Sequence, residues 1–216
     1  MTRVRTEDRI VAGMIELLRR QGYAATGMKQ IVEAGQAPIG SIYHHFPGGK
    51  RDVAAAALRQ SGAAYAELVT MLLAPFDDPA EGVESAFVAA ADTIGSAGWL
   101  NMCPVATVAG EVADTEPALR DAAGEVMASW IDSGTSMFVA RGIPEPDARS
   151  LTFALVSALE GAFVMARTLR STEPILAAGR AMGAYARSLA RARTGSPAGS
   201  EPAPDTASSR LADTDH

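Results

Sequence analysis

Polar side chains that could contact nucleic acid gather in one short segment, residues 26–50. On a helix, one face of this segment would consist of small and polar residues, so the helix could lie deep in the major groove of DNA. Its exposed groups could then hydrogen-bond to base edges or phosphates, although a solvated helix face without a partner would have the same composition. The central run reads Gly40, Ser41, Ile42, Tyr43, His44, His45 and Phe46, and Lys50 follows shortly after it.

The two adjacent histidines, His44 and His45, do not predict a metal site. Adjacent residues of a helix point about 100° apart, whereas two ligands on one face need a spacing of three or four residues. The remaining sequence contains no Ser/His/Asp or Cys/His constellation that would indicate nucleophilic catalysis. We therefore expect no metal, no cofactor and no enzyme, and keep a helical small-molecule-binding protein or enzyme without DNA binding as the alternative.

The composition predicts an all-α protein. Of the 216 residues, 48% are hydrophobic and only 6% are aromatic, and helix-forming residues dominate. No window of about 18 uninterrupted apolar residues predicts a membrane span, and no apolar stretch behind the N-terminal arginines predicts a signal peptide. We expect a cytoplasmic protein whose single cysteine, Cys103, is a buried and unreactive thiol.

The charge of the chain is unevenly distributed. Residues 1–60 contain nine basic and five acidic residues, whereas residues 61–216 contain ten basic and twenty acidic residues. The net charge of −6 therefore combines a basic N-terminal segment with an acidic remainder. Such asymmetry points to a local surface that binds a polyanion, although chance variation in a short segment could also produce it.

Apolar periodicity, glycines and prolines predict a series of helices. Thr6 and Thr26 are the expected N-caps of the first two helices, and Gly35 is the expected left-handed residue after the second. In the third helix, Ile39, Ile42 and Phe46 form the expected buried stripe. The predicted domains are residues 1–50 and residues 51–193, followed by a disordered tail over residues 194–216 that is rich in Pro, Gly and Ser. The first predicted helix follows its cap Thr6 and is ended by Gly22. The other predicted helices cover residues 27–34, 38–45, 50–74, 79–97, 104–113, 117–141, 146–171 and 173–193.

The run from Gly40 to Phe46, with Lys50 behind it, resembles the recognition helix of the TetR family of transcriptional repressors. The span of residues 6–60 is similar to the three-helix DNA-binding domain of that family, which contains a helix-turn-helix. Pro47 to Lys50, Met102 to Val105, and Gly110 with Glu111 resemble the LmrA/YxaF-like branch. The chain departs from the family at Pro38 and Ile39, where many relatives have a polar residue followed by Lys or Arg.

The resemblance implies a dimer that binds a double-stranded DNA operator through two such helices. Tyr43 and His44 would contact backbone phosphates, and Lys50 would add a charge where the free N–H groups of the next helix favour a phosphate. Gln36, Ala37, Pro38 and Ser41 are the candidates for contacting base edges. The full set of expected DNA contacts is Thr26, Lys29, Gln36, Ala37, Pro38, Gly40, Ser41, Tyr43, His44 and Lys50.

The remainder of the chain is expected to form a helical ligand-binding and dimerisation domain. Large, adaptable side chains in its middle helices favour a small apolar effector, although each of them could equally be core. Glu111 is either a polar anchor in that pocket or a surface residue. The candidate effector contacts are Phe87, Trp99, Met102, Cys103, Glu111, Met127, Trp130, Met137 and Phe138.

The last two helices carry stripes of apolar and small residues that predict a homodimer interface. Small residues allow helices to approach closely, and two such helices from each subunit can form a four-helix bundle across a two-fold axis. Packing within one chain would account for part of the same pattern. The candidate interface residues are Leu155, Ala158, Leu159, Ala162, Phe163, Ala166, Met182 and Ala186.

Overall fold

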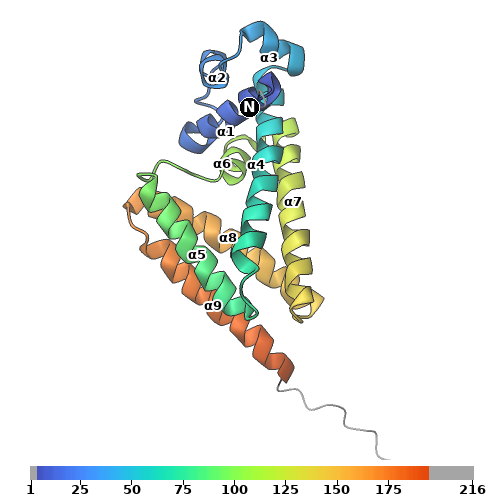
Figure 1. Ribbon diagram of the computed structural model, residues 1–216, viewed down its shortest axis with the longest axis vertical. Coiled ribbons are helices and arrows are strands. Elements are labelled where there is room, and N and C mark those ends of the chain that lie inside the picture. The colour runs from blue at the N-terminus through green and yellow to red at the C-terminus, as the bar shows by residue number, and fades with distance from the viewer. Residues whose placement is uncertain (1–3, 195–216) are drawn as a thin grey trace, which may run out of the picture.

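A computed structural model describes residues 4–194, which form nine helices and no strand (Figure 1). The all-α fold is therefore confirmed, and each helix begins and ends within two residues of its predicted range. The predicted tail lies outside the described residues except for Thr194, the last residue of the final helix. The helices are α1 (Thr6–Gln21), α2 (Met28–Gly35), α3 (Ile39–His45), α4 (Lys50–Leu73), α5 (Pro79–Ser96), α6 (Pro104–Val112), α7 (Pro117–Ala140), α8 (Glu145–Leu169) and α9 (Glu173–Thr194).

Helices α1, α2 and α3 form the head of the molecule (Figure 1). The left-handed residue after α2 was expected to be Gly35, but in the structure it is Gln36, with φ of 47°. Gly35 is required for a different reason, because a Cβ atom there would lie 3.0 Å from the Cα atom of Ile10 on α1. The glycine therefore lets α1 and α2 pack closely, and the following residue makes the turn.

The stripe expected on α3 is only partly buried. Ile42 and Phe46 lie in the core, but the side chain of Ile39 is 53% exposed. The prediction for Ile39 was wrong because this residue begins the helix directly after Pro38, one turn before the part of α3 that faces the core. An exposed isoleucine is therefore available on the same short helix as the polar residues.

One hydrophobic core joins the head to the rest of the molecule. It contains Ile10, Met14 and Ile31 of the head, and it continues without interruption to Leu58 of α4 and Val105 of α6. The expected division at residue 50 thus falls at the first residue of α4, whose N-terminal half packs with the head. A movement of α4 or α6 would consequently change the position of the head.

A second core lies among α5, α8 and α9, with the ends of α4 and α7 closing it (Figure 1). Gly179 lets α9 approach α5, since a Cβ atom there would lie 2.6 Å from the Cβ atom of Phe87. Within the described residues, α8 alone is long and apolar enough, by length and composition, to cross a membrane. Only 22% of its most apolar window is buried in the chain, so α8 has an apolar face that this single chain leaves uncovered.

Candidate DNA-binding surface and effector domain

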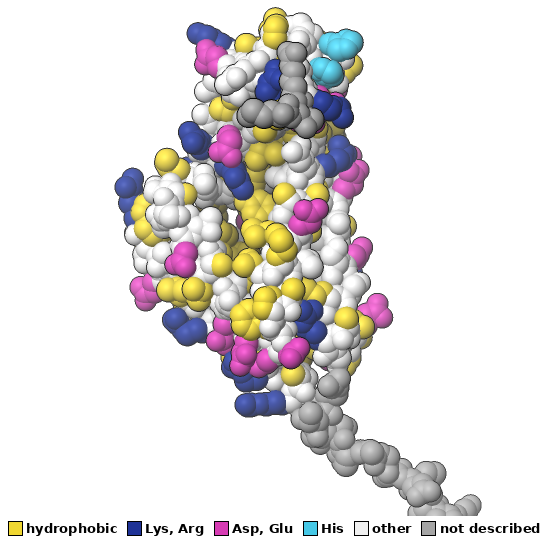
Figure 2. All heavy atoms as spheres, viewed as in Figure 1, with side chains coloured by type: hydrophobic (Ala, Val, Ile, Leu, Met, Phe, Trp, Pro, Cys, Tyr) yellow, Lys and Arg dark blue, Asp and Glu magenta, His cyan; other side chains and the backbone are white. Residues whose placement is uncertain are grey.

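Helix α3 lies at one end of the molecule (Figure 1), and several of its polar side chains are exposed there. Tyr43 is 50% exposed, and His44 and Gly40 are also exposed. A Cβ atom built on Gly40 would meet no atom within 4 Å, so the backbone is open on this side. Figure 2 shows the two histidine side chains at this tip, with Lys and Arg side chains around the head.

The start of α4 lies beside this surface. Gly49, with φ of 62°, brings the loop against Tyr43, whose Cε1 atom would lie 3.0 Å from a Cβ atom at that glycine. The Nζ atom of Lys50 lies 4.0 Å from the centre of the Tyr23 ring, a cation–π contact. Burial, the larger cause, lowers the pKa of Lys50, while the nearby carboxylates of Glu111 and Glu116 raise it. The ammonium group is thus held at the helix N-terminus, where an anion would also be favoured.

Two of the expected DNA contacts are buried in the head. Ala37 is only 3% exposed, so its side chain cannot reach a base edge. Thr26 is 1% exposed, and its hydroxyl donates to the carbonyl oxygen of Gly22 at 2.7 Å. The N-cap of α2 is Gly27, whose N–H donates to Gln30 Oε1. We therefore leave both Ala37 and Thr26 out of the proposed contacts.

The other candidates keep surface positions. The side chain of Lys29 is 90% exposed and lies 4.0 Å from Glu33, so it could leave this weak pair for a phosphate. Gln36 and Pro38 are exposed, and Ser41 is half-buried. These residues lie on or beside α2 and α3, which brings most of the expected DNA-binding set onto one end of the head.

The expected effector contacts do not meet in one place. Some pack in or against the first core, namely Cys103, Met127 and Trp130. Burial raises the pKa of the Cys103 thiol, which fits an unreactive cysteine. Others pack in or against the second core, namely Phe87, Trp99, Met137 and Phe138.

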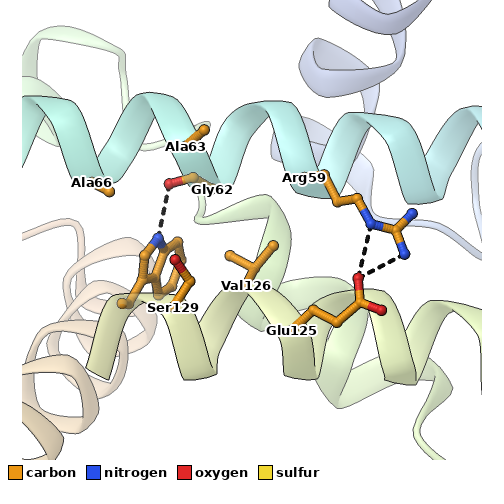
Figure 3. A pocket seen from close by; sticks show the side chains of 8 residues that line it. Arg59, Gly62, Ala63, Ala66, Glu125, Val126 and Ser129 are labelled. Atoms are coloured by element: carbon orange, nitrogen blue, oxygen red, sulfur yellow. Dashed lines mark hydrogen bonds and ion pairs between the residues drawn. The ribbon is translucent and has the colours of Figure 1, made fainter. Parts of the chain in front are cut away.

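Trp130 lines a cavity of about 200 Å³ between α4 and α7 (Figure 3). Its Nε1 atom donates a hydrogen bond of 2.8 Å to the carbonyl oxygen of Gly62. At the other end of the cavity, Arg59 and Glu125 form an ion pair of 2.7 Å. The other lining residues are Ala63, Ala66, Val126 and Ser129. Gly62 lets α4 and α7 approach closely beside the cavity, because a Cβ atom there would lie 2.3 Å from Cγ1 of Val126.

Glu111 lies at the joint between α6 and the head. Its Oε2 atom accepts hydrogen bonds from the backbone N–H groups of Tyr23 at 2.8 Å and of Ala24 at 3.0 Å. Near it, the N–H group of Met102 donates to the carbonyl oxygen of Arg19. No local sequence pattern indicates this joint, because the carboxylate and its two donors are 88 and 87 residues apart along the chain.

Several expected dimer contacts are used inside the chain. Ala162, Ala166 and Ala186 are buried in the second core, because their small side chains let α8 and α9 pack within one molecule. Leu155, Leu159, Phe163 and Met182 are partly buried against the same core, and Ala158 is half-buried. The large apolar side chains that α8 exposes are instead Phe153, Val164, Met165 and Leu169.

Comparisons with known proteins connect this geometry to transcription. Residues 10–57 match the model of the family described as bacterial regulatory proteins, tetR family, and residues 79–181 match the LmrA/YxaF-like C-terminal domain of transcriptional regulators. The HTH-type transcriptional regulator LmrA of Bacillus subtilis is 26% identical over 79% of this chain and 91% of that relative. An uncharacterized HTH-type transcriptional regulator of Mycobacterium tuberculosis is 30% identical over 78% of this chain and 87% of that relative.

Solved structures agree on the fold. A regulatory protein TetR from Rhodobacter sphaeroides superposes with a TM-score of 0.73 at 22% identity, over 83% of this chain and 98% of that one. The reduced form of Escherichia coli NemR superposes with a TM-score of 0.68 at 21% identity, over 85% of this chain and 97% of that one. Both cover the head and the helical body together.

Proposed function

Because the chain belongs to the TetR family of bacterial transcriptional regulators, we propose that it binds operator DNA as a homodimer and releases it when a small molecule binds. The regulators of this family are not enzymes, and the head is their DNA-binding part. The observation that carries the proposal is the exposed end of the head, where Tyr43, His44 and open Gly40 lie beside Lys50. As a repressor of transcription, the protein would act in the bacterial cytoplasm.

DNA binding would divide the exposed side chains of the head between two tasks. Tyr43, Lys50 and Lys29 would contact phosphates and so fix the position of the head on the duplex. Gln36 and Ser41 would lie close to base edges, with Gly40 allowing the backbone of α3 to approach the groove. Exposed Ile39 would add an apolar contact, for which the methyl group of thymine is the suitable partner.

The uncovered face of α8 supports a homodimer. Phe153, Val164, Met165 and Leu169 are all exposed on this helix, and large exposed apolar patches mark sites of protein association. Helices of a second subunit packed along α8 would cover them, and a two-fold axis at this interface would place the two heads side by side. Two heads related in this way read a pseudo-palindromic operator whose half-sites lie about 34–36 Å apart, one turn of the double helix.

Release of the operator would follow from a change in the position of α6. The carboxylate of Glu111 ties this helix to the turn between α1 and α2, so a displaced α6 would carry the head with it. A small apolar effector in the helical body would act only through its higher affinity for the released arrangement. Met127 and Trp130, which pack against the core shared by α6 and the head, remain the expected contacts that best fit this route.

The direct test is a fluorescence-anisotropy titration of the full chain against its own upstream DNA. We expect the chain to bind that DNA more tightly than an unrelated duplex of equal length, with a stoichiometry of two chains per duplex. Tyr43→Phe removes only the exposed hydroxyl and should weaken binding to both duplexes by several-fold, as loss of a phosphate contact would. Equal and weak binding of the two duplexes by the unmodified chain would contradict the proposal and favour a ligand-binding protein without DNA binding.

A further inference from the structure

A second cavity, of about 170 Å³, lies between α1 of the head and the middle of α4. The residues that line it recur at intervals of one helical turn, so each of the two helices turns one face toward it. Among these lining residues Arg19 alone carries a charge, and we call this space the Arg19 cavity. The lining residues are Ile15 and Arg19 of α1, and Gln60, Ser61, Ala64, Tyr65 and Leu68 of α4.

The guanidinium group of Arg19 is held only loosely by its own chain. Its Nη1 atom lies 3.3 Å from Oε1 of Glu16, whereas an N–H group paired with a carboxylate usually lies about 2.7–2.9 Å from the oxygen. The side chain of Glu16 is 52% exposed, and an ion pair in contact with water contributes little. The Nε atom of Arg19 is buried and forms no hydrogen bond within the described residues, which is costly for a polar group. The guanidinium group therefore has donors left for a stronger acceptor.

The polar side of the cavity offers hydrogen-bond donors. The side chain of Arg19 is 30% exposed, so a ligand can reach it. The Tyr65 hydroxyl accepts from Arg19 Nη2 at 3.2 Å, which leaves its own O–H group able to donate. The Ser61 hydroxyl already donates to the carbonyl oxygen of Leu58 at 3.1 Å. A group that accepts hydrogen bonds and carries a negative charge is therefore the complement of Arg19 and Tyr65.

The other side of the cavity is apolar and continues along the surface of α4. Ile15, Ala64 and Leu68 form this side. Leu68 is 43% exposed, and Met71, one helical turn further along α4, is 64% exposed. Covering these side chains would remove apolar surface from water, which is favourable. The cavity thus suits a molecule with one charged end and an apolar body.

A single guanidinium group suits a single negative charge. A carboxylate carries one charge and can accept two parallel hydrogen bonds from a guanidinium group, whereas a phosphate ester carries about −1.5 to −2 charges at neutral pH. Glu16 already stands beside Arg19, so a second negative charge on the ligand would have no partner in the cavity. The charged end is therefore a carboxylate.

We propose that the Arg19 cavity binds the carboxylate of a small monocarboxylic acid, whose apolar body lies against Ile15 and Leu68. This assignment rests on the proposed function, since it names the chemical class of the effector. It also adds a carboxylate to the apolar molecule expected from the sequence. The Tyr65 ring meets the Trp130 ring edge-on at 6.4 Å between centroids, so the site adjoins one of the expected effector contacts.

The end of α1 that borders the cavity is also bonded to the helical body. The N–H group of Met102 donates to the carbonyl oxygen of Arg19 at 3.1 Å. Arg167 of α8 donates from Nη2 to the carbonyl oxygen of Arg20, also at 3.1 Å. A ligand that displaces α1 from α4 would change both contacts and, with them, the position of the head.

The test compares two probes of nearly equal shape and different charge, 4-phenylbutanoate and 4-phenylbutanamide. Isothermal titration of the full chain without DNA should show the acid binding at least about tenfold more tightly than the amide, as expected for hydrogen bonds to a charged group. Arg19→Gln removes the positive charge and should abolish this preference. The proposal is overturned if the unmodified chain binds both probes equally, or if Arg19→Gln keeps the full preference for the acid.

Glu16→Gln tests the same site through a gain of affinity. The change removes the carboxylate that competes for Arg19, so the acid should bind about two- to fivefold more tightly, the range of an exposed ion pair, while the amide is unaffected. Because Glu16 is exposed, this variant should fold, and it keeps the proposal testable if Arg19→Gln unfolds. Acid binding that is unchanged or weaker in Glu16→Gln contradicts the assignment.

Arg59→Gln is the matched control. Arg59 lines the cavity of Figure 3 together with Trp130 and is paired with Glu125 at 2.7 Å, so its replacement should leave the preference for the acid unchanged. A preference lost in Arg59→Gln and kept in Arg19→Gln would place the acid in that cavity and overturn the assignment.

The outcome is separable from the proposed function because the titration contains no DNA. A chain that binds its operator but shows no preference for the acid contradicts only the assignment of the Arg19 cavity. A chain that binds the acid through Arg19 but shows no preference for operator DNA contradicts only the proposed function.

Discussion

The head and the layer of α5, α8 and α9 are both helical, yet different kinds of side chain define them. In the head, α3 turns Tyr43, His44 and Ile39 outward, so the residues that matter for recognition are on the surface. In the layer, Phe87, Leu151 and Ile175 are buried, and their main task is to hold the helices together. Substitutions in the layer should therefore change stability, whereas those on the head should change DNA binding.

The largest effect on stability is expected from Phe138→Ala, at the end of α7 that packs against the layer. Phe138 is among the largest fully buried side chains of the chain, and truncating a buried phenylalanine typically destabilises a protein by about 3–5 kcal/mol. Urea denaturation followed by circular dichroism would measure the loss. Operator affinity of the protein that remains folded should be unchanged, so a reduced affinity under fully folded conditions would show that the two regions are not separable in this way.

A smaller effect, at the joint between α6 and the head, is expected from Glu111→Ala. The change removes the acceptor of the N–H groups of Tyr23 and Ala24, and since water can reach this exposed joint the cost should be about 0.5–1.5 kcal/mol. Hydrogen exchange should accelerate at these two amides while the amides of α9 keep their protection. Glu111→Gln retains a carbonyl acceptor and should behave closer to the unmodified chain, and equal exchange in all three proteins would argue against the joint.

The smallest effect on stability, and the clearest on DNA, is expected from Lys50→Ala. The side chain loses its contact with the Tyr23 ring, which is a contribution of about 0.5–1 kcal/mol at an exposed site. Operator binding should weaken for every sequence, and the slope of log affinity against log salt should decrease by about 0.9, the value of one phosphate contact. An unchanged slope, measured between low and high salt, would remove Lys50 from the DNA interface.

Helix boundaries were predictable because prolines and glycines mark them along the chain. Pro79, Pro104 and Pro117 each begin a helix in the structure, as a residue without an N–H group can do at no cost. The exposed polar side chains of α3 were also predictable from local sequence, since Tyr43 and His44 belong to one continuous motif. Ile39 was misplaced because the period of a seven-residue helix does not say where its burial begins, and Ala37 was misplaced because it lies in the turn before α3, where no helical period applies.

Contacts between distant segments could not be predicted from the sequence. Glu111 reaches Tyr23, and Arg19 reaches Tyr65, but neither pair shares a local pattern. A glutamate in an apolar helix looks the same whether it faces water or the backbone of another segment. The stripes on α8 and α9 did not separate dimer contacts from core residues for the same reason, because small residues allow close packing within one chain as well as between two.

The hydrogen bond from Trp130 to Gly62 makes Trp130 an intrinsic fluorescent probe of the contact between α4 and α7. The indole bridges α4 and α7 while half-buried, and its emission depends on how much water reaches it. If the two helices separate, the bond breaks and the emission moves to longer wavelength, whereas Trp99 on the loop after α5 would report separately. In a Trp99→Phe background, rapid mixing could therefore time the opening of α4 from α7 in an unlabelled protein.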